Sequence, residues 1–234
     1  MSDRLQGVSW SNPLGTDELG RDVFSRLIYA GRVSLSASLV AACVATAIGL
    51  PSGLVAGYMG GAVDSMLSRF TDAIMCCPPL ILAMGVIAAL GPSTRNAMLA
   101  IGLVYSPRLF RISRASTLSI RNASFIDAAK ALSYPRRRII FRHVLPSLAS
   151  TVIVQVALIA GFALLAEASL SFLGLGVQPP TPSWGGMLQR AYMEIHSAPF
   201  LMIPPGVAIA LAVFAFNQVG DGLRERSGRS SNGN

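Results

Sequence analysis

Long apolar runs occupy most of the chain, and short polar segments separate them. Several runs approach or exceed the roughly 18 to 20 residues that a helix needs to cross the hydrocarbon of a bilayer. Ordinary core helices are shorter. The pattern predicts an all-α, polytopic membrane protein with about five spans, over residues 33–57, 73–94, 96–112, 144–166 and 197–220.

The first 32 residues have a different pattern, because charged residues are frequent there and no apolar core of a signal peptide is present. Over 16–32, apolar and charged positions fall on opposite helix faces: Leu19, Val23 and Leu27 on one, and the pairs Asp17–Arg21 and Asp22–Arg26 on the other. With Thr16 as N-cap, this predicts an amphipathic helix lying in the membrane interface, within an extracytoplasmic segment 1–32.

Within the first predicted span, glycines recur every fourth residue at Gly49, Gly53 and Gly57. This spacing places small residues on one helix face, where a second helix can approach closely. We therefore expect this face to pack against another helix.

Composition supports a membrane protein, since 52% of the residues are hydrophobic and 13% charged, against about a quarter charged in soluble domains. The net charge of +8 does not indicate nucleic acid, because the basic residues sit beside apolar runs and form no separate basic domain. Cys43, Cys76 and Cys77 lie inside apolar runs without the spacing of a disulfide framework or zinc site.

Most of the 19 Lys and Arg residues fall on one side of the predicted spans. Because loops rich in Lys and Arg stay in the cytoplasm, the loop 113–143 and the tail 221–234 are predicted to be cytoplasmic and the N-terminus external. An external N-terminus without a signal peptide leads us to expect one more helix upstream in a related full-length chain.

The cytoplasmic loop predicts two short helices joined by a turn. Ser124 followed by Asp127 is a variant of the capping box, and Phe125, Ala129 and Leu132 then line one helix face. Pro135 suits the first position of a second helix, which carries Arg136, Arg137, Arg138 and Arg142. Most of these arginines are expected to orient the chain in the membrane; Arg136 is a candidate for a specific contact.

Asp127-Ala128-Ala129, the turn at Ser133 and Val144-Leu145-Pro146 resemble the EAA loop of ABC importer permeases. Residues 12–38, 167–188 and 216–224 resemble the C-type inner-membrane permease subunit of dipeptide, oligopeptide and nickel importers. The resemblance covers nearly the whole chain. It implies the six-helix permease core of that family without its first helix, in the inner membrane.

The resemblance also implies partners: a second, B-type permease subunit, cytoplasmic ATPase subunits, an extracytoplasmic substrate-binding protein and membrane lipid. The EAA loop would be a coupling helix that docks on the ATPase, through Ser124, Phe125, Asp127, Ala128, Ala129, Lys130, Leu132, Ser133 and Arg136. Asp127 replaces the usual Glu, and Ser133 the usual Gly. Asp127 as a simple helix cap is an alternative that can coexist with docking.

No enzymatic site is predicted. A P-loop requires GxxxxGK[ST], and the only lysine is Lys130, so ATP and Mg²⁺ are expected on the partner ATPases and no cofactor or metal on this chain. His143 and His196 belong to opposite interfaces and do not form a hydrolase or metal site. Glu167 is a candidate for the translocation path or outer gate, with a structural role as the alternative.

The predicted function is ATP-driven import of di- or oligopeptides by alternating access. Nickel or glutathione is an alternative substrate, and a channel or secondary transporter uncoupled from ATP is an alternative class. Secondary transporters often show two related halves with paired broken helices, and no such internal repeat is visible.

Overall fold

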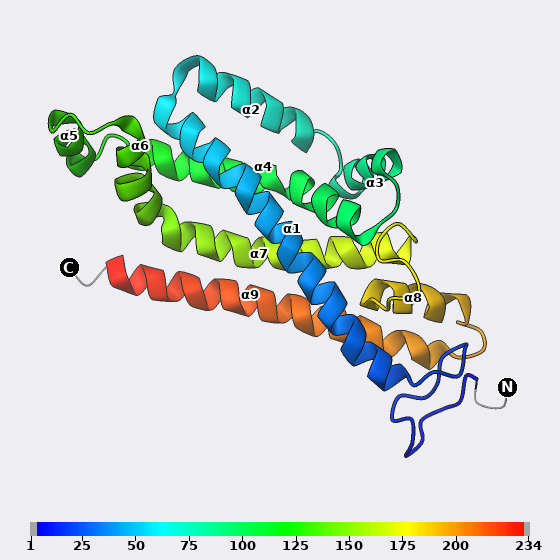
Figure 1. Cartoon of the computed structure of the whole chain (residues 1–234). Helices are drawn as coiled ribbons and strands as arrows, with labels where there is room; N and C mark the ends of the chain where they lie inside the picture. Colours follow the sequence, from blue (N-terminus) through cyan, green and yellow to red (C-terminus); the bar gives the residue numbers. More distant parts are fainter. Residues whose placement is uncertain (1–3, 232–234) are drawn as a thin grey trace. The chain divides into compact units, whose positions relative to one another are not determined.

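A computed structural model describes residues 4–231, with side chains through Glu225. Helices dominate the described chain, which has a single isolated bridge, Thr16 to Asp22, and no longer strand. The elements are α1 Val23–Met59, α2 Gly61–Met75, α3 Pro79–Leu90, α4 Thr94–Ile120, α5 Ser124–Ala131, α6 Arg136–Ile139, the π-helix η1 Ile140–Val144, α7 Leu145–Phe172, α8 Trp184–Met193, the 3-10 helix η2 Pro199–Met202 and α9 Ile203–Ser231 (Figure 1). The predicted all-α fold is confirmed.

The chain forms two compact units. The first comprises Met1–Ala41, Leu80–Ile101 and Ala160–Phe216, and the second comprises Ala42–Pro79, Gly102–Ile159 and Asn217–Asn234. The helices α1, α4, α7 and α9 each contribute residues to both units.

In the first unit, Trp184 is the centre of the apolar packing. Its ring packs with Ala30, Leu164, Ala168 and Ile209, and its indole Nε1 donates to the Leu27 carbonyl at 3.0 Å. Small residues around the ring allow α1, α7 and α8 to meet there.

In the second unit, α1 and α4 make a close helix contact through glycine. A Cβ at Gly53 would lie 2.6 Å from the Phe110 carbonyl oxygen, and one at Gly57 would lie 2.7 Å from Thr117 Cβ. Gly49 likewise faces the Ser106 carbonyl. Any larger residue on this glycine face would push the two backbones apart.

Ion pairs join α2 to α4 in the same unit. Arg114 binds Asp64 with both Nε and Nη2, the latter at 2.7 Å from Oδ2. Arg111 Nη2 lies 2.8 Å from Asp72 Oδ1. The first pair is the less exposed of the two. Two of the arginines on α4, Arg111 and Arg114, therefore each pair with a carboxylate on α2.

The predicted amphipathic helix over 16–32 is wrong for residues 16–22, which form turns. The Asp17 carboxylate accepts hydrogen bonds from the backbone N–H groups of Leu19 and Arg21 and from Arg21 Nε, and these bonds close a turn instead of a helix. Thr16 does not cap a helix, because its hydroxyl accepts from the Gln6 backbone N–H. The helix begins at Val23 and continues to Met59.

Asp22 precedes α1 and binds its first turn. Its carboxylate accepts from the Ser25 hydroxyl and, at 2.8 Å, from the Ser25 backbone N–H. The Ser25 hydroxyl holds the pKa of Asp22 below its usual range. The predicted Asp22–Arg26 pair is therefore wrong, and Arg26 Nε lies 3.5 Å from Asp17 instead.

The predicted spans agree with long helices in three cases and differ in two. Val23–Met59, Arg136–Phe172 and Pro199–Glu225 are long and apolar enough to cross a membrane. The segment 73–94 is not one helix: α2 and α3 are separated at Cys76–Pro78, where adjacent prolines remove backbone donors. The predicted span 96–112 belongs to the longer helix α4, which continues to Ile120.

Candidate functional site

The helix α5 is short and begins without a side-chain cap. Its N-cap residue is Ala123, and no side chain hydrogen-bonds the first turn. The predicted capping box is therefore wrong, because Ser124 is already helical and Asp127 Oδ1 binds Lys130 Nζ at 2.8 Å. Asp127 still lies in the first turn, where the helix dipole favours an acid.

One face of α5 is anchored in the second unit's core. Ile126 is fully buried and Ala129 is 3% exposed, and both pack in a cluster with Leu54, Ile139 and Val144. Complete burial of an isoleucine side chain contributes about 1.5–3 kcal/mol. The short helix is thus held by tertiary packing, since eight residues are too few for independent stability.

The opposite face of α5 is exposed. Phe125 is 45% and Leu132 66% exposed, and Asp127 and Ala128 are exposed beside them. The prediction that Phe125, Ala129 and Leu132 share one face is wrong, because Ala129 points into the core while the other two point away from it. Ile126, three residues before Ala129, completes the buried face that sequence reasoning missed.

The turn after α5 is a Schellman motif. Ser133 has φ +57°, its N–H donates to the Lys130 carbonyl at 2.9 Å, and the Tyr134 N–H donates to the Ala129 carbonyl at 3.2 Å. Ser133 therefore adopts the left-handed conformation for which glycine is usual at this position.

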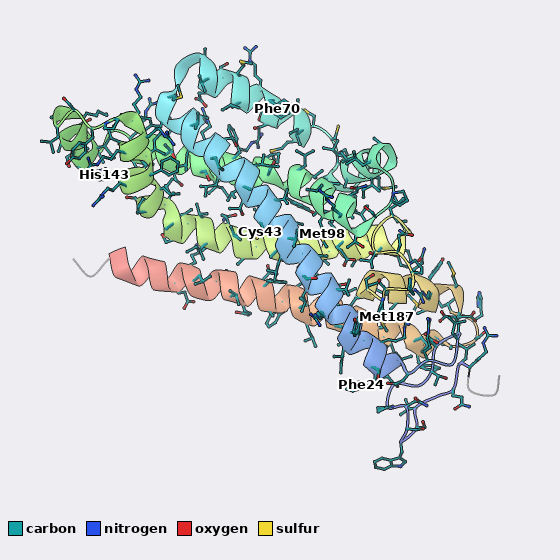
Figure 2. The ribbon with its side chains drawn as sticks, viewed as in Figure 1. Phe24, Cys43, Phe70, Met98, His143 and Met187 are labelled. Carbon is teal, nitrogen blue, oxygen red and sulfur yellow. The ribbon has the colours of Figure 1, made fainter. Side chains whose placement is uncertain are left out.

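Tyr134 connects this turn to the helix that follows. The Arg138 guanidinium lies 4.3 Å from the centre of its ring, and the His143 ring stacks on it with centroids 6.3 Å apart. His143 belongs to η1, the π-helical turn between α6 and α7 (Figure 2). A π-helical turn is rare and occurs often at functional sites.

Glu167 lies in the first unit and is 2% exposed. The Ser171 hydroxyl donates to its Oε1 at 2.7 Å, and its Oε2 is buried without a hydrogen-bond partner among the described residues. Two serines bind the backbone after α7: the Val177 N–H donates to Ser171 Oγ, and the N–H of Trp184, the first residue of α8, donates to Oγ of Ser34 in α1, both at 3.1 Å.

Glu167 thus holds Ser171, which in turn holds the backbone of the segment after α7. Gly176 and Gly185 make this arrangement possible, because a Cβ at Gly176 would contact Ser171 and one at Gly185 would contact Ala168. The spacing Glu167–Ser171, four residues on one helix, was visible in the sequence. The contact of Ser34 with the Trp184 backbone was not, because Ser34 lies on α1, far away in the sequence.

Other reactive groups do not come together in the described part of the chain. Cys43, Cys76 and Cys77 are exposed free thiols. No group of three or more His, Cys, Asp or Glu residues is placed to hold a metal ion among the residues described. The two clusters with the most specific geometry are therefore the α5 loop and the Glu167 network.

Comparison with known proteins identifies the chain. A family model described as "Binding-protein-dependent transport system inner membrane component" matches residues 49–231. The chain belongs to this family. The permease is therefore an inner-membrane component of an ABC importer, and the predicted family and function are confirmed.

The permease is similar to curated proteins along nearly its whole length. It is 44% identical over 224 residues to the dipeptide transport system permease protein DppC of Alkalihalophilus pseudofirmus, covering 96% of this chain and 74% of that protein. It is 40% identical over 224 residues to the glutathione transport system permease protein GsiD of Pectobacterium atrosepticum, covering 95% of this chain and 74% of that protein.

The permease also resembles a solved structure. The MetNI methionine ABC transporter, in an inward-facing conformation, matches with a TM-score of 0.71 over 86% of this chain and 96% of that chain, at 16% sequence identity. At this identity the match supports the fold alone. It agrees with the all-helical permease architecture described above.

Proposed function

We propose that this permease pairs with a second permease subunit and imports peptides delivered by an external binding protein, driven by partner ATPases. The observation that carries the proposal is the construction of α5. One face is fixed in the core by Ile126 and Ala129, and the other presents Phe125, Ala128 and Leu132 to solvent. When a partner protein displaces a short helix that is fixed in this way, the displacement is passed on to α7.

The path from α5 to α7 is short and well packed. The Schellman turn, the Tyr134 ring with its contacts to Arg138 and His143, and η1 follow one another without a flexible linker. Movement of α5 would therefore displace the start of the helix Arg136–Phe172 directly. Alternating access requires this kind of rigid coupling between an ATPase and a spanning helix.

The proposed orientation places α5 in the cytoplasm and the α7–α8 segment outside, following the distribution of Lys and Arg. The ATPases would then meet the exposed face of α5 and supply the site for ATP and Mg²⁺. The segment held by Glu167 would lie on the side of the binding protein, with Glu167 in the outer gate as a positioning residue.

Peptides are the substrate class that the relatives favour. The proteins similar to this chain include one named for dipeptide transport and others named for glutathione transport. Glutathione is itself a small peptide, so both names agree on substrates with amide bonds and a free carboxylate. Dipeptides are the first substrate to test, and glutathione is the second.

The test replaces an exposed alanine of α5 in the reconstituted complex with its ATPases, second permease and binding protein. Ala128→Trp places a large ring on the docking face, and we expect it to reduce peptide-stimulated ATP hydrolysis at least tenfold while membrane insertion is unchanged. Ala62→Trp, at an exposed alanine of α2, is the matched control and should retain activity. Equal ATPase stimulation in the two variants would refute the docking role of α5.

A further inference from the structure

A cavity of about 450 Å³ lies behind α5 in the second unit. It is bounded by the end of α1, the end of α4, α5 and the start of α6. The polar side chains that line it are Tyr58, Arg121, Asn122, Lys130, Tyr134 and Arg136. All of them offer hydrogen-bond donors, and no carboxylate is among the lining residues. The cavity is therefore suited to an anion with several acceptor oxygens.

The three cationic side chains of this cavity are Arg121, Lys130 and Arg136, and other protein groups use only part of their hydrogen-bonding capacity and charge. Arg121 Nη1 donates to the Gly57 carbonyl at 3.3 Å, which leaves the rest of its guanidinium available. Lys130 Nζ binds Asp127, which offsets part of its charge. Arg136 has no ion pair with any residue whose side chain the structure describes. The cavity thus retains a net positive charge that an anion would neutralise.

The position of the cavity favours a lipid over a soluble anion. Tyr58 and Met59 end the apolar helix Val23–Met59, and Arg136 begins the apolar helix Arg136–Phe172. The lining therefore lies where membrane-crossing helices end, which is the level of phospholipid headgroups, and tyrosine is typical of that level. Met59 is 51% exposed and gives the cavity an apolar edge. Basic pockets between spanning helices on the cytoplasmic side bind anionic headgroups.

We propose that this cavity binds the phosphate of an anionic phospholipid, with Arg136 and Arg121 as the principal ligands and the two tyrosine hydroxyls as further donors. The location at a cytoplasmic headgroup level rests on the proposed orientation of the permease. A bound lipid would contact α5, α6 and the ends of α1 and α4 together, and would stabilise the base on which α5 is seated.

The test uses the permease alone, purified in detergent and delipidated, so that it does not depend on transport or on ATPase docking. Binding of dihexanoyl phosphatidylglycerol is measured by microscale thermophoresis and by the shift in thermal unfolding temperature. We expect saturable binding, and no comparable binding of dihexanoyl phosphatidylcholine. Arg136→Gln should weaken binding about 5- to 10-fold, as expected for one cation at a lipid phosphate.

Arg137→Gln is the matched control, because Arg137 is exposed on the same helical turn and does not line the cavity. It should bind phosphatidylglycerol like the unmodified chain. Lys130→Gln provides a second lining variant and should also weaken binding. Equal losses for Arg136→Gln and Arg137→Gln would overturn the site. If inorganic phosphate binds as tightly as phosphatidylglycerol, the ligand of the cavity is a free phosphate and the lipid proposal is refuted. If the permease binds only a purified partner ATPase and no phosphatidylglycerol, the lipid proposal is refuted and the cavity is assigned to that protein.

Discussion

Ser133 occupies a backbone position that favours glycine. A left-handed conformation costs an L-residue roughly 1–2 kcal/mol, yet the turn is retained because the N–H groups of Ser133 and Tyr134 close the end of α5. The family resemblance suggested glycine here, and the structure shows that serine adopts the same turn. Serine at this position therefore forms the left-handed turn that closes α5.

Ser133→Gly should stabilise the permease by about 0.5–1 kcal/mol, since it removes the left-handed strain but adds unfolded-state entropy. Thermal or denaturant unfolding in detergent measures the difference. Ser124→Gly is the control, because Ser124 is helical and the same change there should destabilise by a few tenths of a kcal/mol. A loss of stability in Ser133→Gly would contradict the strained turn.

Glu167 is a second residue whose role depends on its partners. Glu167→Leu leaves the buried hydroxyl of Ser171 without its acceptor, and should destabilise the permease by about 1–3 kcal/mol. Glu167→Gln keeps a carbonyl oxygen as acceptor and should cost less. Unfolding measurements compare the variants, and limited proteolysis between Leu173 and Ser183 reports the order of that segment. Identical protease sensitivity in the unmodified chain and Glu167→Leu would argue against a positioning role.

At the scale of elements, the contact between α1 and α4 depends on the absence of side chains. A Cβ added to Gly49, Gly53 or Gly57 would lie closer to backbone or Cβ atoms of α4 than real Cβ atoms do. The spacing in the sequence predicted a helix-packing face, but it did not identify the partner helix. That partner is separated from α1 by two other helices along the chain.

Gly53→Ala should destabilise the permease by about 1–3 kcal/mol, because the new methyl group overlaps the Phe110 carbonyl. Gly85→Ala is its matched control in the interior of α3, where a Cβ has no atom within 4 Å. There the same substitution should stabilise the helix by about 0.5–1 kcal/mol. Unfolding of both variants in one detergent measures the two effects, and a shared sign would contradict the close approach at Gly53.

At the scale of the whole molecule, charge determines the proposed orientation. The basic residues of the loop 113–143 and the tail 221–234 fall on one side of the predicted spans, which predicts that side as cytoplasmic. Exposed positions near the two ends of α7 can test this arrangement without a fusion protein. Arg137 lies before α7, and Thr181 lies in the segment after it.

Single cysteines at these two positions should label from opposite sides. In a background with Cys43, Cys76 and Cys77 replaced by serine, Thr181→Cys should react with a membrane-impermeant maleimide in intact spheroplasts. Arg137→Cys should react only after permeabilisation. Labelling of both cysteines in intact spheroplasts, or the reverse order, would refute the proposed orientation.

The sequence by itself determined the class, the family and most of the helices. Long apolar runs require helices in a membrane because every backbone polar group must be paired there, and this requirement holds whatever the neighbouring helices are. The motifs around Asp127 and over 167–188 were sufficient to identify the family. The glycine spacing and the pairing of Glu167 with Ser171 also depend on local periodicity, so they were accessible without coordinates.

Only the tertiary structure decided which side chains face which way at the polar segments. Ala129 is buried because it packs with Leu54 and Ile139, and Leu54 comes from α1, far away in the sequence. Residues 16–22 form turns because Asp17 binds nearby backbone N–H groups more favourably than a helix would allow. Local periodicity is strong in long apolar helices and weak in short polar ones, where packing against distant residues selects the conformation.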